Sequence, residues 1–337
     1  MLGFLWRQWA SMGVAGYAKR REPWVIDPEA LLLFSTEIAR QDPRLFDEIL
    51  DWLHDQAGWI SLQRLSRMRA EHSFGSDTVL CAIAEHLTRE SSNQKWKVVW
   101  SRKAVAAGAA AQAGPQPLFP EAGQFGENDS IFLKWGWQRS PVRYRGLGSA
   151  PRFDHPGPFL LKLRSLFGRQ SRAEIIAWLL ANESGHPAKI ARQTGYFRRS
   201  VQVVLNELEV SGHVRARRVG REKHFAILHE QWRFLANWEN SDTFPSGFPR
   251  WIIWPAVFEL LDGVRKVLFH PDLESMSTSL TAIELRTAIT DANLPATGLP
   301  TQLQPATSLK GEAFLNDTLL KLQQFLDPTN APALFQP

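Results

Sequence analysis

The sequence predicts a mainly α-helical protein with small β-hairpins, of the α+β class. Apolar residues recur at i, i+3, i+4 and i+7 spacing along most of the chain, as they do in amphipathic helices. Alternating runs typical of paired strands are short and few. The chain has 337 residues, of which 44% are hydrophobic, and this is enough for two or three domains with cores of their own.

Residues 1–103 are predicted to form an N-terminal helical domain. Asp27-Pro28 and Asp42-Pro43 each combine a capping side chain with proline at the first helical position. Apolar spacing then predicts one helix lined by Leu31 to Ile38 and a second lined by Leu45 to Leu53. The other elements expected here are two helices and two short strands, namely Ser61–Ala70 and Ser76–Arg89, and Trp59-Ile60 and Trp96–Trp100.

Residues 104–158 are predicted to be a linker followed by an extended connector. Ala104–Asn128 is rich in Ala, Gly, Pro and Gln, a composition typical of linkers. Ile131–Trp137 alternates like a strand, and Ser140–Pro158 contains Pro, Gly and Arg in an extended stretch.

Residues 159–230 are predicted to hold a lead-in helix, Phe159–Phe167, and then three helices and a hairpin. Ser171-Arg172-Ala173-Glu174 has the form of a capping box at the start of the first of the three. Pro187 opens a short second helix over 187–193, and Thr194-Gly195-Tyr196 forms a tight turn in which Gly195 supplies a positive φ.

The third helix is predicted over Phe197–Ser211. Its buried face is formed by Val201, Val204, Leu205 and Leu208, and Gly212 ends it. His213–Arg217 and Lys223–Leu228 then alternate like the two strands of a hairpin with Gly220 at its tip.

This stretch resembles the winged helix-turn-helix transcriptional regulators of the MarR and ArsR type. The resemblance lies in Ile190-Ala191-Arg192-Gln193-Thr194-Gly195-Tyr196, in the Val201, Leu205 and Leu208 spacing, and in Ser211-Gly212-His213-Val214, and it covers about 60 residues near 171–228. One departure is Phe197, where the family usually has a Ser or Thr cap. The resemblance implies a DNA-binding dimer whose third helix enters the major groove.

Charge supports the same interpretation independently. Residues 187–223 contain nine basic and three acidic side chains, a net charge of +6, whereas the whole chain carries +5. Positive charge gathered on one helix and one loop is the electrostatic footprint of a phosphate-binding surface. The alternatives are a solvated basic face and a winged helix used for protein contact.

The expected DNA contacts fall into three groups. Arg198, Arg199, Ser200, Gln202 and Asn206 face outward near the start of the third helix, where side chains reach base edges. Lys189 and Arg192 on the second helix are expected to hold phosphates. The wing is expected to touch the flanking backbone or the minor groove through Arg217, Arg218, Arg221 and Lys223.

The N-terminal domain leaves two alternatives open. Its predicted order of helix, short strand, helix, helix and strand is also that of a winged helix, and Ser61–Lys103 has eight basic against four acidic residues. This region is therefore either a second, divergent winged helix or a helical dimerisation or scaffold domain that shares the order.

Residues 231–337 are predicted to be a helical region for dimerisation or regulation. The expected helices cover His229–Glu239, a long amphipathic segment from Pro255, Ser279–Ala292 and Phe314–Leu326. They are expected to bury their apolar faces against the winged helix, a second subunit or both. Close spacing of Trp232, Trp238, Trp251 and Trp254 leaves open an aromatic pocket for a small molecule beside the ordinary alternative, core packing.

Several classes of function find no support in the sequence. The sequence contains no run of eighteen apolar residues, so we expect no membrane span. The first residues lack the basic segment and cleavage site of a secretory signal. The one cysteine, Cys81, fits a reducing cytoplasm. Catalytic, nucleotide-binding and metal-binding motifs are absent, so we expect neither an enzyme nor a cofactor.

The sequence therefore predicts a cytoplasmic transcriptional regulator, a repressor, that binds double-stranded DNA as a homodimer. A small molecule or a protein is the expected kind of effector. The alternative from another class is an assembly component of a defence or toxin–antitoxin system, whose winged helices would bind a partner protein.

Overall fold

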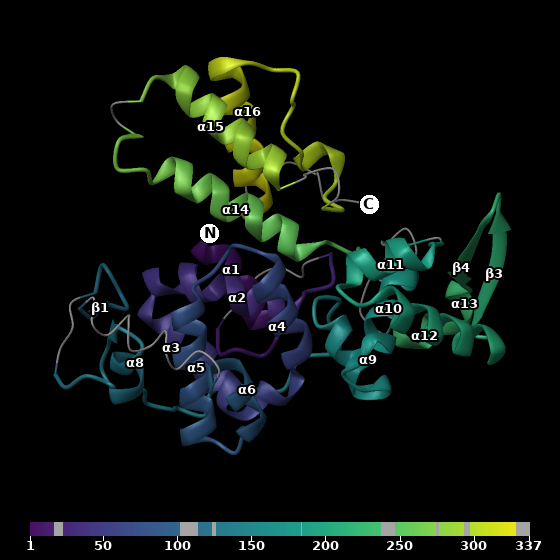
Figure 1. Cartoon of the computed structure of the whole chain (residues 1–337), viewed down its shortest axis with the longest axis horizontal. Helices are drawn as coiled ribbons and strands as arrows, with labels where there is room; N and C mark the ends of the chain where they lie inside the picture. The colour runs from purple at the N-terminus through teal and green to yellow at the C-terminus, as the bar shows by residue number, and fades with distance from the viewer. Residues whose placement is uncertain are drawn as a thin grey trace.

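The computed structural model describes residues 1–16, 23–101, 114–122, 126–182, 184–236, 247–273, 276–292 and 297–327. The chain is mainly helical, with two small two-stranded sheets, which confirms the predicted fold class at that level. Figure 1 shows three groups of elements: the N-terminal helices, a second group with a protruding hairpin, and three helices near the C-terminus.

The N-terminal helices bury an apolar core. They are α1 (Leu2–Ser11), α2 (Pro28–Ile38), α3 (Pro43–Gln56), α4 (Leu62–Glu71), α5 (Asp77–Glu90) and the short α6 (Lys97–Trp100). The predicted caps form as expected at two starts, since Asp27 accepts from the amides of Glu29 and Ala30, and Asp42 from those of Arg44 and Leu45. Ser76 likewise caps α5 by accepting from the amide of Val79.

Three strands predicted in the first half of the chain are wrong. Trp59 ends a 3₁₀ turn, Ala57–Trp59, and residues 94–100 form a 3₁₀ turn followed by α6. Burial explains the second error: Trp96 and Val99 are buried at helical spacing, whereas Val98, which a strand would place beside Trp96, is 52% exposed. Among the described residues 23–101 no strand forms, so the second winged helix lacks its expected β elements.

The third wrong strand is Ile131–Trp137, which is mostly the short helix α8 (Ser130–Lys134). Asp129 caps this helix, because its side chain accepts from the amides of Ile131 and Phe132, both at 3.0 Å. Only β2 (Trp137–Gln138) remains extended, and it pairs in parallel with β1 (Gln116–Pro117). Residues 104–113 and 123–125 of the predicted linker lie outside the described residues.

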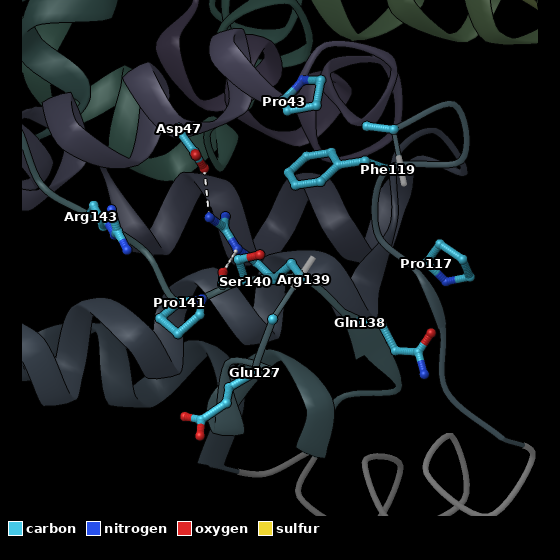
Figure 2. A pocket seen from close by; sticks show the side chains of 12 residues that line it. Pro43, Asp47, Pro117, Phe119, Glu127, Gln138, Arg139, Ser140, Pro141 and Arg143 are labelled. Atoms are coloured by element: carbon cyan, nitrogen blue, oxygen red, sulfur yellow. Dashed lines mark hydrogen bonds and ion pairs between the residues drawn. The ribbon is translucent and has the colours of Figure 1, made fainter. Parts of the chain in front are cut away.

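The connector 140–158 contains neither helix nor strand, as predicted, and it is anchored to α3. The carboxylate of Asp51 accepts from four successive amides, those of residues 145–148, at 2.7–3.3 Å. Just before the connector, Arg139 is 3% exposed, and its guanidinium pairs with Asp47 (Figure 2) and lies 5.5 Å from the ring centroid of Phe119. These contacts fix the connector on the N-terminal helices.

The second group of elements has its own core. It comprises α9 (Phe159–Phe167), α10 (Ser171–Ala181), α11 (Pro187–Thr194), α12 (Arg198–Val210), β3 (Val214–Val219), β4 (Glu222–Ile227) and α13 (His229–Trp232). The strands form an antiparallel hairpin in which Val214 pairs with Ile227 and Val219 with Glu222. Apart from Leu161, which belongs to the N-terminal core, the buried apolar residues of this group form a cluster of their own. The element order expected for 159–230 is therefore present.

The capping box expected at Ser171 does not form. Ser171 is already inside α10, Gln170 occupies the cap position, and no side chain caps the helix. The carboxylate of Glu174 instead accepts from Arg164. Ser61 does stand at the cap position of α4, but its side chain makes no capping bond and its amide donates to Glu29.

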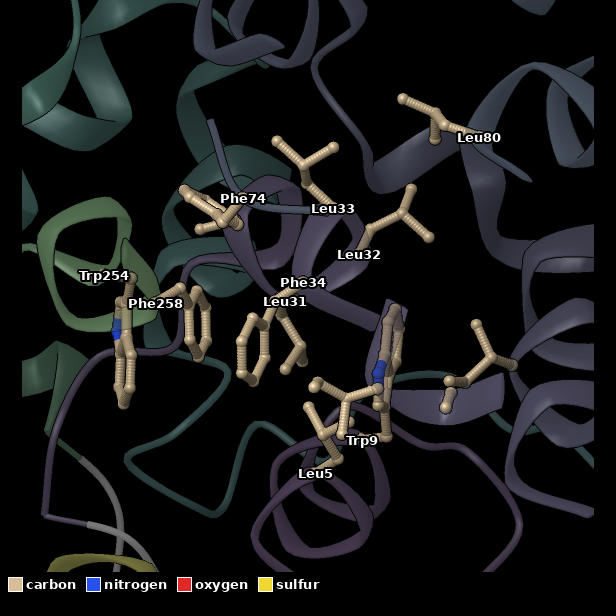
Figure 3. Close-up of a cluster of buried hydrophobic side chains, with 14 of the residues drawn as sticks. Leu5, Trp9, Leu31, Leu32, Leu33, Phe34, Phe74, Leu80, Trp254 and Phe258 are labelled. Atoms are coloured by element: carbon tan, nitrogen blue, oxygen red, sulfur yellow. The ribbon is translucent and has the colours of Figure 1, made fainter. Parts of the chain in front are cut away.

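The C-terminal helices α14 (Trp254–Leu268), α15 (Thr278–Asp291) and α16 (Gly311–Leu326) pack against the N-terminal domain. Phe258 of α14 stacks on Phe34 of α2 with ring centroids 4.4 Å apart, and Trp254 lies beside it (Figure 3). The helices α1–α6 and α14–α16 thus share one core, which the predicted domain division separates. The expected packing of these helices on residues 159–230 is not what forms, because the matching apolar face lies on α1 and α2.

Candidate nucleic-acid interface

The turn between α11 and α12 has the predicted geometry. Gly195 adopts φ +73°, and its amide and that of Tyr196 both donate to the carbonyl of Ala191, at 3.0 and 3.1 Å. Val201, Val204, Leu205 and Leu208 form the buried face of α12. Burial of this face fixes the rotation of the helix, so its opposite side is exposed.

We expect Gly195→Ala to destabilise the fold by about 1–2 kcal/mol, the cost of a left-handed conformation for a residue with a Cβ. A Cβ at this position would meet only Arg64 Nε, at 3.7 Å, so the cost is conformational rather than steric. Urea unfolding followed by circular dichroism measures it. Gly58→Ala is the matched control, because a Cβ there meets nothing within 4 Å and φ is not positive. Equal stability of the two variants would contradict the assignment of strain to Gly195.

The residues predicted at the start of α12 lie on its exposed side. Arg198, Arg199, Ser200 and Asn206 are exposed, and Gln202 is half-buried. Gln202 Nε2 donates to Asn206 Oδ1 at 2.9 Å, so these two amides are aligned along the helix. Neither arginine forms a hydrogen bond or ion pair with the part of the chain that the structure describes.

The hairpin carries the second group of predicted residues. Arg217, Arg218 and Arg221 are exposed and have no ion-pair partner among the described residues. Arg218 lies directly opposite Lys223 in the register, an arrangement of like charges that weakens a hairpin. The positive charge at this tip therefore does not serve the stability of the hairpin.

Lys223 differs from the other predicted contacts because it is already engaged. Its Nζ donates to Glu209 Oε2 at 2.5 Å and lies 4.9 Å from the ring centroid of Phe225. The pair ties β4 to the last turns of α12. Lys223 thus positions the hairpin relative to the helix and offers less free charge than Arg218.

On α11, Lys189 and Arg192 are both exposed. Lys189 lies over the ring of Trp178, with Nζ 5.6 Å from its centroid. The guanidinium of Arg192 has no hydrogen-bond partner among the described residues and lines a cavity between α4 and α14.

The N-terminal domain contacts the turn from the other side, which the sequence patterns do not predict. Arg64 of α4 donates from Nε to the carbonyl of Thr194, the last residue of α11, at 3.1 Å. One turn further along α4, the guanidinium of Arg67 lies 4.5 Å from the ring centroid of Phe197, the residue that precedes α12. The position of α4 is therefore coupled to the start of α12.

A cluster of buried charges fixes this junction. Arg164 of α9 donates to Glu29 of α2 at 2.7 Å and to Glu174 of α10 at 2.6 Å. Arg64 donates to Glu29 Oε2 at 2.7 Å and pairs with both carboxylate oxygens of Asp27. All five side chains are buried. Because a buried charge is tolerated only when it is paired, the cluster holds the α9–α12 unit in one orientation against α2 and α4.

The pKa of Glu29 reports the balance of forces in this cluster. Burial alone raises the pKa of this carboxyl, but Arg164 and Arg64 outweigh burial and lower the pKa to about 2. Burial lowers the pKa of Arg164, and the carboxylates of Glu29 and Glu174 raise it further than burial lowers it. The charged forms are therefore the stable ones at neutral pH.

Three of the four tryptophans considered for an aromatic pocket are described, and they do not share one cluster: Trp254 belongs to one core, and Trp232 and Trp251 to another. Trp254 is buried in the N-terminal core, where its Nε1 donates to the carbonyl of Val25 at 2.6 Å. Trp232 belongs to the core of the α9–α12 unit, and Trp251 packs against that core. Trp238 lies outside the described residues.

A different cavity, of about 620 Å³, lies beside α3 in the N-terminal domain (Figure 2). The guanidinium of Arg139 dominates its wall, but it already pairs with Asp47 at 2.8 Å and lies over Phe46, Phe119 and Phe132. The residues that line the cavity are far along the chain from α12. The contacts of Arg139 are therefore those of a structural arginine that is packed in the fold.

Within the described ranges, no group of three His, Cys, Asp or Glu side chains is arranged to hold a metal ion. Nor does any helix of those ranges have the length and apolar character needed to cross a membrane. Comparison of the chain with protein-family models, with curated proteins and with solved structures finds no match in any of the three.

Proposed function

We propose that α10, α11, α12 and the β3–β4 hairpin form a winged helix-turn-helix, and that the chain is a transcriptional regulator that reads double-stranded DNA. The observation that carries the proposal is a set of exposed guanidinium groups without partners among the described residues. They belong to Arg198, Arg199, Arg217, Arg218 and Arg221.

Comparison with exposed arginines elsewhere in the chain strengthens this argument. Arg152 is exposed and pairs with Asp154 at 2.8 Å, and the half-buried Arg172 of α10 pairs with Glu207. Arg143 and Arg250 are also exposed without a side-chain partner among the described residues, but they lie far apart in the sequence, whereas the five arginines above all lie on α12 and the hairpin. Such a surface is suited to the phosphates of a duplex, which would replace the missing carboxylates.

In this proposal α12 enters the major groove, where Arg198 and Arg199 reach base edges or nearby phosphates together with Ser200, Gln202 and Asn206. Lys189 and Arg192 contact one phosphate backbone, and the hairpin contacts the flanking backbone or minor groove. We further propose a cytoplasmic repressor that binds its operator as a homodimer, in keeping with the resemblance to the MarR and ArsR type.

The salt dependence of binding to random duplex DNA tests the proposal. Each phosphate neutralised adds about −0.9 to the slope of log K against log salt concentration. Five exposed cations are assigned to phosphates, so we expect a slope of about −4 to −5; they are Lys189, Arg192, Arg217, Arg218 and Arg221. Fluorescence anisotropy of a labelled random duplex at 50–200 mM KCl measures it. A slope near zero, or no binding at 50 mM KCl, would remove DNA as the partner.

A second candidate is a protein-interaction component of a defence or toxin–antitoxin system. Exposed apolar residues on α12 favour it: Phe197 before the helix is 63% exposed, and Val203 and Val210 within it are 50% and 89% exposed. Such a partner would bind mainly through apolar contact and with weak salt dependence. The same titration therefore separates the two candidates.

A further inference from the structure

A cavity of about 390 Å³ lies where α4, α11 and the start of α14 meet, three segments far apart in the sequence that adjoin in Figure 1. Gly195, in the turn before α12, forms part of its wall. Small-molecule sites have volumes of about 300–1,000 Å³, so this cavity suits a small metabolite rather than a large cofactor.

Most charged groups that line the cavity are already neutralised. Arg64 is held by Asp27 and Glu29, and His72 Nδ1 lies 2.9 Å from Glu259 Oε1. Glu71 accepts from Arg67 Nε at 2.7 Å. Because Glu71 and Glu259 are already paired, their carboxylates are not available to bind a cation in the cavity.

Two guanidinium groups have N–H donors without a hydrogen-bond partner among the described residues. Arg67 leaves its Nη1 buried without a hydrogen-bond partner, and Arg192 of α11 has no partner among the described residues. A buried donor without an acceptor is costly, and a ligand that supplies an acceptor removes the cost. Two arginines from different helices suit a carboxylate or phosphate group, which accepts from both.

The rest of the lining constrains the ligand further. Met68, Pro255 and Ala256 provide apolar wall, and Asp291 at the end of α15 is an exposed carboxylate that suits a hydrogen-bond donor. The fitting compound is small, carries one carboxylate or phosphate, has a short apolar body and bears a hydroxyl or amine.

We propose that this cavity is the effector site of the regulator, a role that rests on the proposed DNA-binding function. Arg192 belongs to both surfaces, since it lines the cavity and is the α11 residue assigned to a DNA phosphate. An anion in the cavity draws Arg192 and Arg67 toward itself. Because Arg67 contacts Phe197 and Arg64 donates to Thr194, this also shifts the start of α12. The effector thus lowers DNA affinity by about tenfold, within the range of 5–150-fold common for allosteric coupling.

Sodium phosphate and sodium succinate serve as the two probes, at constant ionic strength set by KCl. Thermal unfolding and tryptophan fluorescence of the full chain, which has fourteen tryptophans, report binding. We expect saturable binding of at least one probe, at least tenfold weaker in Arg67→Gln and in Arg192→Gln. Lys97→Gln, which removes one exposed positive charge from α6, outside the cavity, is expected to bind as the natural chain does.

The preferred probe distinguishes phosphate from carboxylate chemistry. Absence of saturable binding for both probes, or equal binding by the natural chain, Arg67→Gln and Arg192→Gln, overturns the proposed site. Arg192→Gln keeps the test decisive if Arg67→Gln fails to fold, since Arg192 is exposed and its guanidinium forms no hydrogen bond or ion pair with the described residues.

Random-duplex affinity with and without the probe separates this proposal from the one on which it rests. Anion binding that depends on both arginines, in a chain that does not bind DNA, supports the cavity and refutes the regulator. DNA binding that both probes leave unchanged at constant ionic strength supports the regulator and refutes the effector role. A fall in DNA affinity must be matched by an equal fall in anion affinity when DNA is bound, because coupling is reciprocal.

Discussion

Replacing Glu29 by Gln is expected to lower the free energy of unfolding by about 3–5 kcal/mol, the cost of removing one partner from a buried ion cluster. Glu29 accepts from Arg164 through both oxygens and from Arg64 and the amide of Ser61. Glutamine keeps the volume of the side chain but removes its negative charge. The buried guanidinium groups of Arg64 and Arg164 then have only Asp27 and Glu174 as charged partners. Urea unfolding followed by circular dichroism and by tryptophan fluorescence measures the loss.

Glu37→Gln on the same helix is the matched control. Glu37 also pairs with arginines, Arg40 at 3.3 Å and Arg265 at 3.5 Å, but it is partly exposed. Ion pairs in contact with solvent contribute about 0–1 kcal/mol to stability. We therefore expect Glu37→Gln to lower the free energy of unfolding by no more than about 1 kcal/mol. Equal losses in the two variants would mean that burial of the cluster adds nothing to its strength.

The same cluster makes stability depend on pH. The pKa of Glu29 is about 2 in the folded chain and near its ordinary value of 4.5 when unfolded. A lowered pKa means that the unfolded chain binds the proton more tightly, so the stabilisation is complete above about pH 4.5 and is lost as the pH falls toward 2. Between pH 5 and pH 3 the natural chain should therefore lose more stability than Glu29→Gln. If the free energy of unfolding falls equally with pH in the natural chain and in Glu29→Gln, the acid sensitivity does not come from Glu29.

The sequence predicts the α9–α12 unit well because its local signals agree with one another. Proline at position 187, glycine at the turn and four apolar residues at helical spacing all specify the same elements, and the structure forms α11 and α12 within one or two residues of the predicted bounds. The candidate contact residues are exposed for the same reason. Once the buried face of an amphipathic helix is known, its opposite face follows.

Long-range pairing could not be predicted in this way. The sequence predicts capping roles for Asp27 and Glu174, and Ser61 lies at the cap position of α4. In the structure Asp27 also pairs with Arg64, the Ser61 amide donates to Glu29, and Glu174 accepts from Arg164. A signal was present: Glu29 and Arg164 are charged residues inside otherwise apolar segments, a pattern that indicates a buried partner. The identity of that partner, 135 positions away along the chain, is not written in either segment.

The same limit explains the errors around Trp96 and in the C-terminal region. Alternation over five residues cannot distinguish a strand from a short helix when tertiary contacts decide which residues are buried. The sequence shows the apolar face of α14. It does not show that this face packs against Phe4 and Phe34, on helices near the other end of the chain.

Arg199→Ala and Arg218→Ala are expected to weaken DNA binding in different ways. Arg199, on the exposed side of α12 near its start, is in the position from which side chains reach base edges. Its loss should weaken binding to the specific site by about 1–3 kcal/mol and relax the sequence preference there, with little effect on random duplexes. Arg218, on the hairpin, is assigned to the phosphate backbone, so its loss should weaken binding to all sequences alike and reduce the salt slope by about 1.

The measurement begins with selection of tight-binding duplexes from a random pool by the natural chain. The symmetry and spacing of the selected sites also report whether the chain binds as a dimer. Affinities of the natural chain and both variants are then compared on a selected and a random duplex. Arg152→Ala is the control, because Arg152 is exposed but pairs with Asp154 on the connector.

Each outcome bears on a separate assignment. If both variants lose affinity equally on the two duplexes, α12 binds only phosphates and sequence is read elsewhere. If Arg152→Ala loses as much as Arg218→Ala, net charge rather than the hairpin governs binding. Affinities unchanged in both variants would remove α12 and the hairpin from the interface, and with them the observation on which the regulator proposal depends.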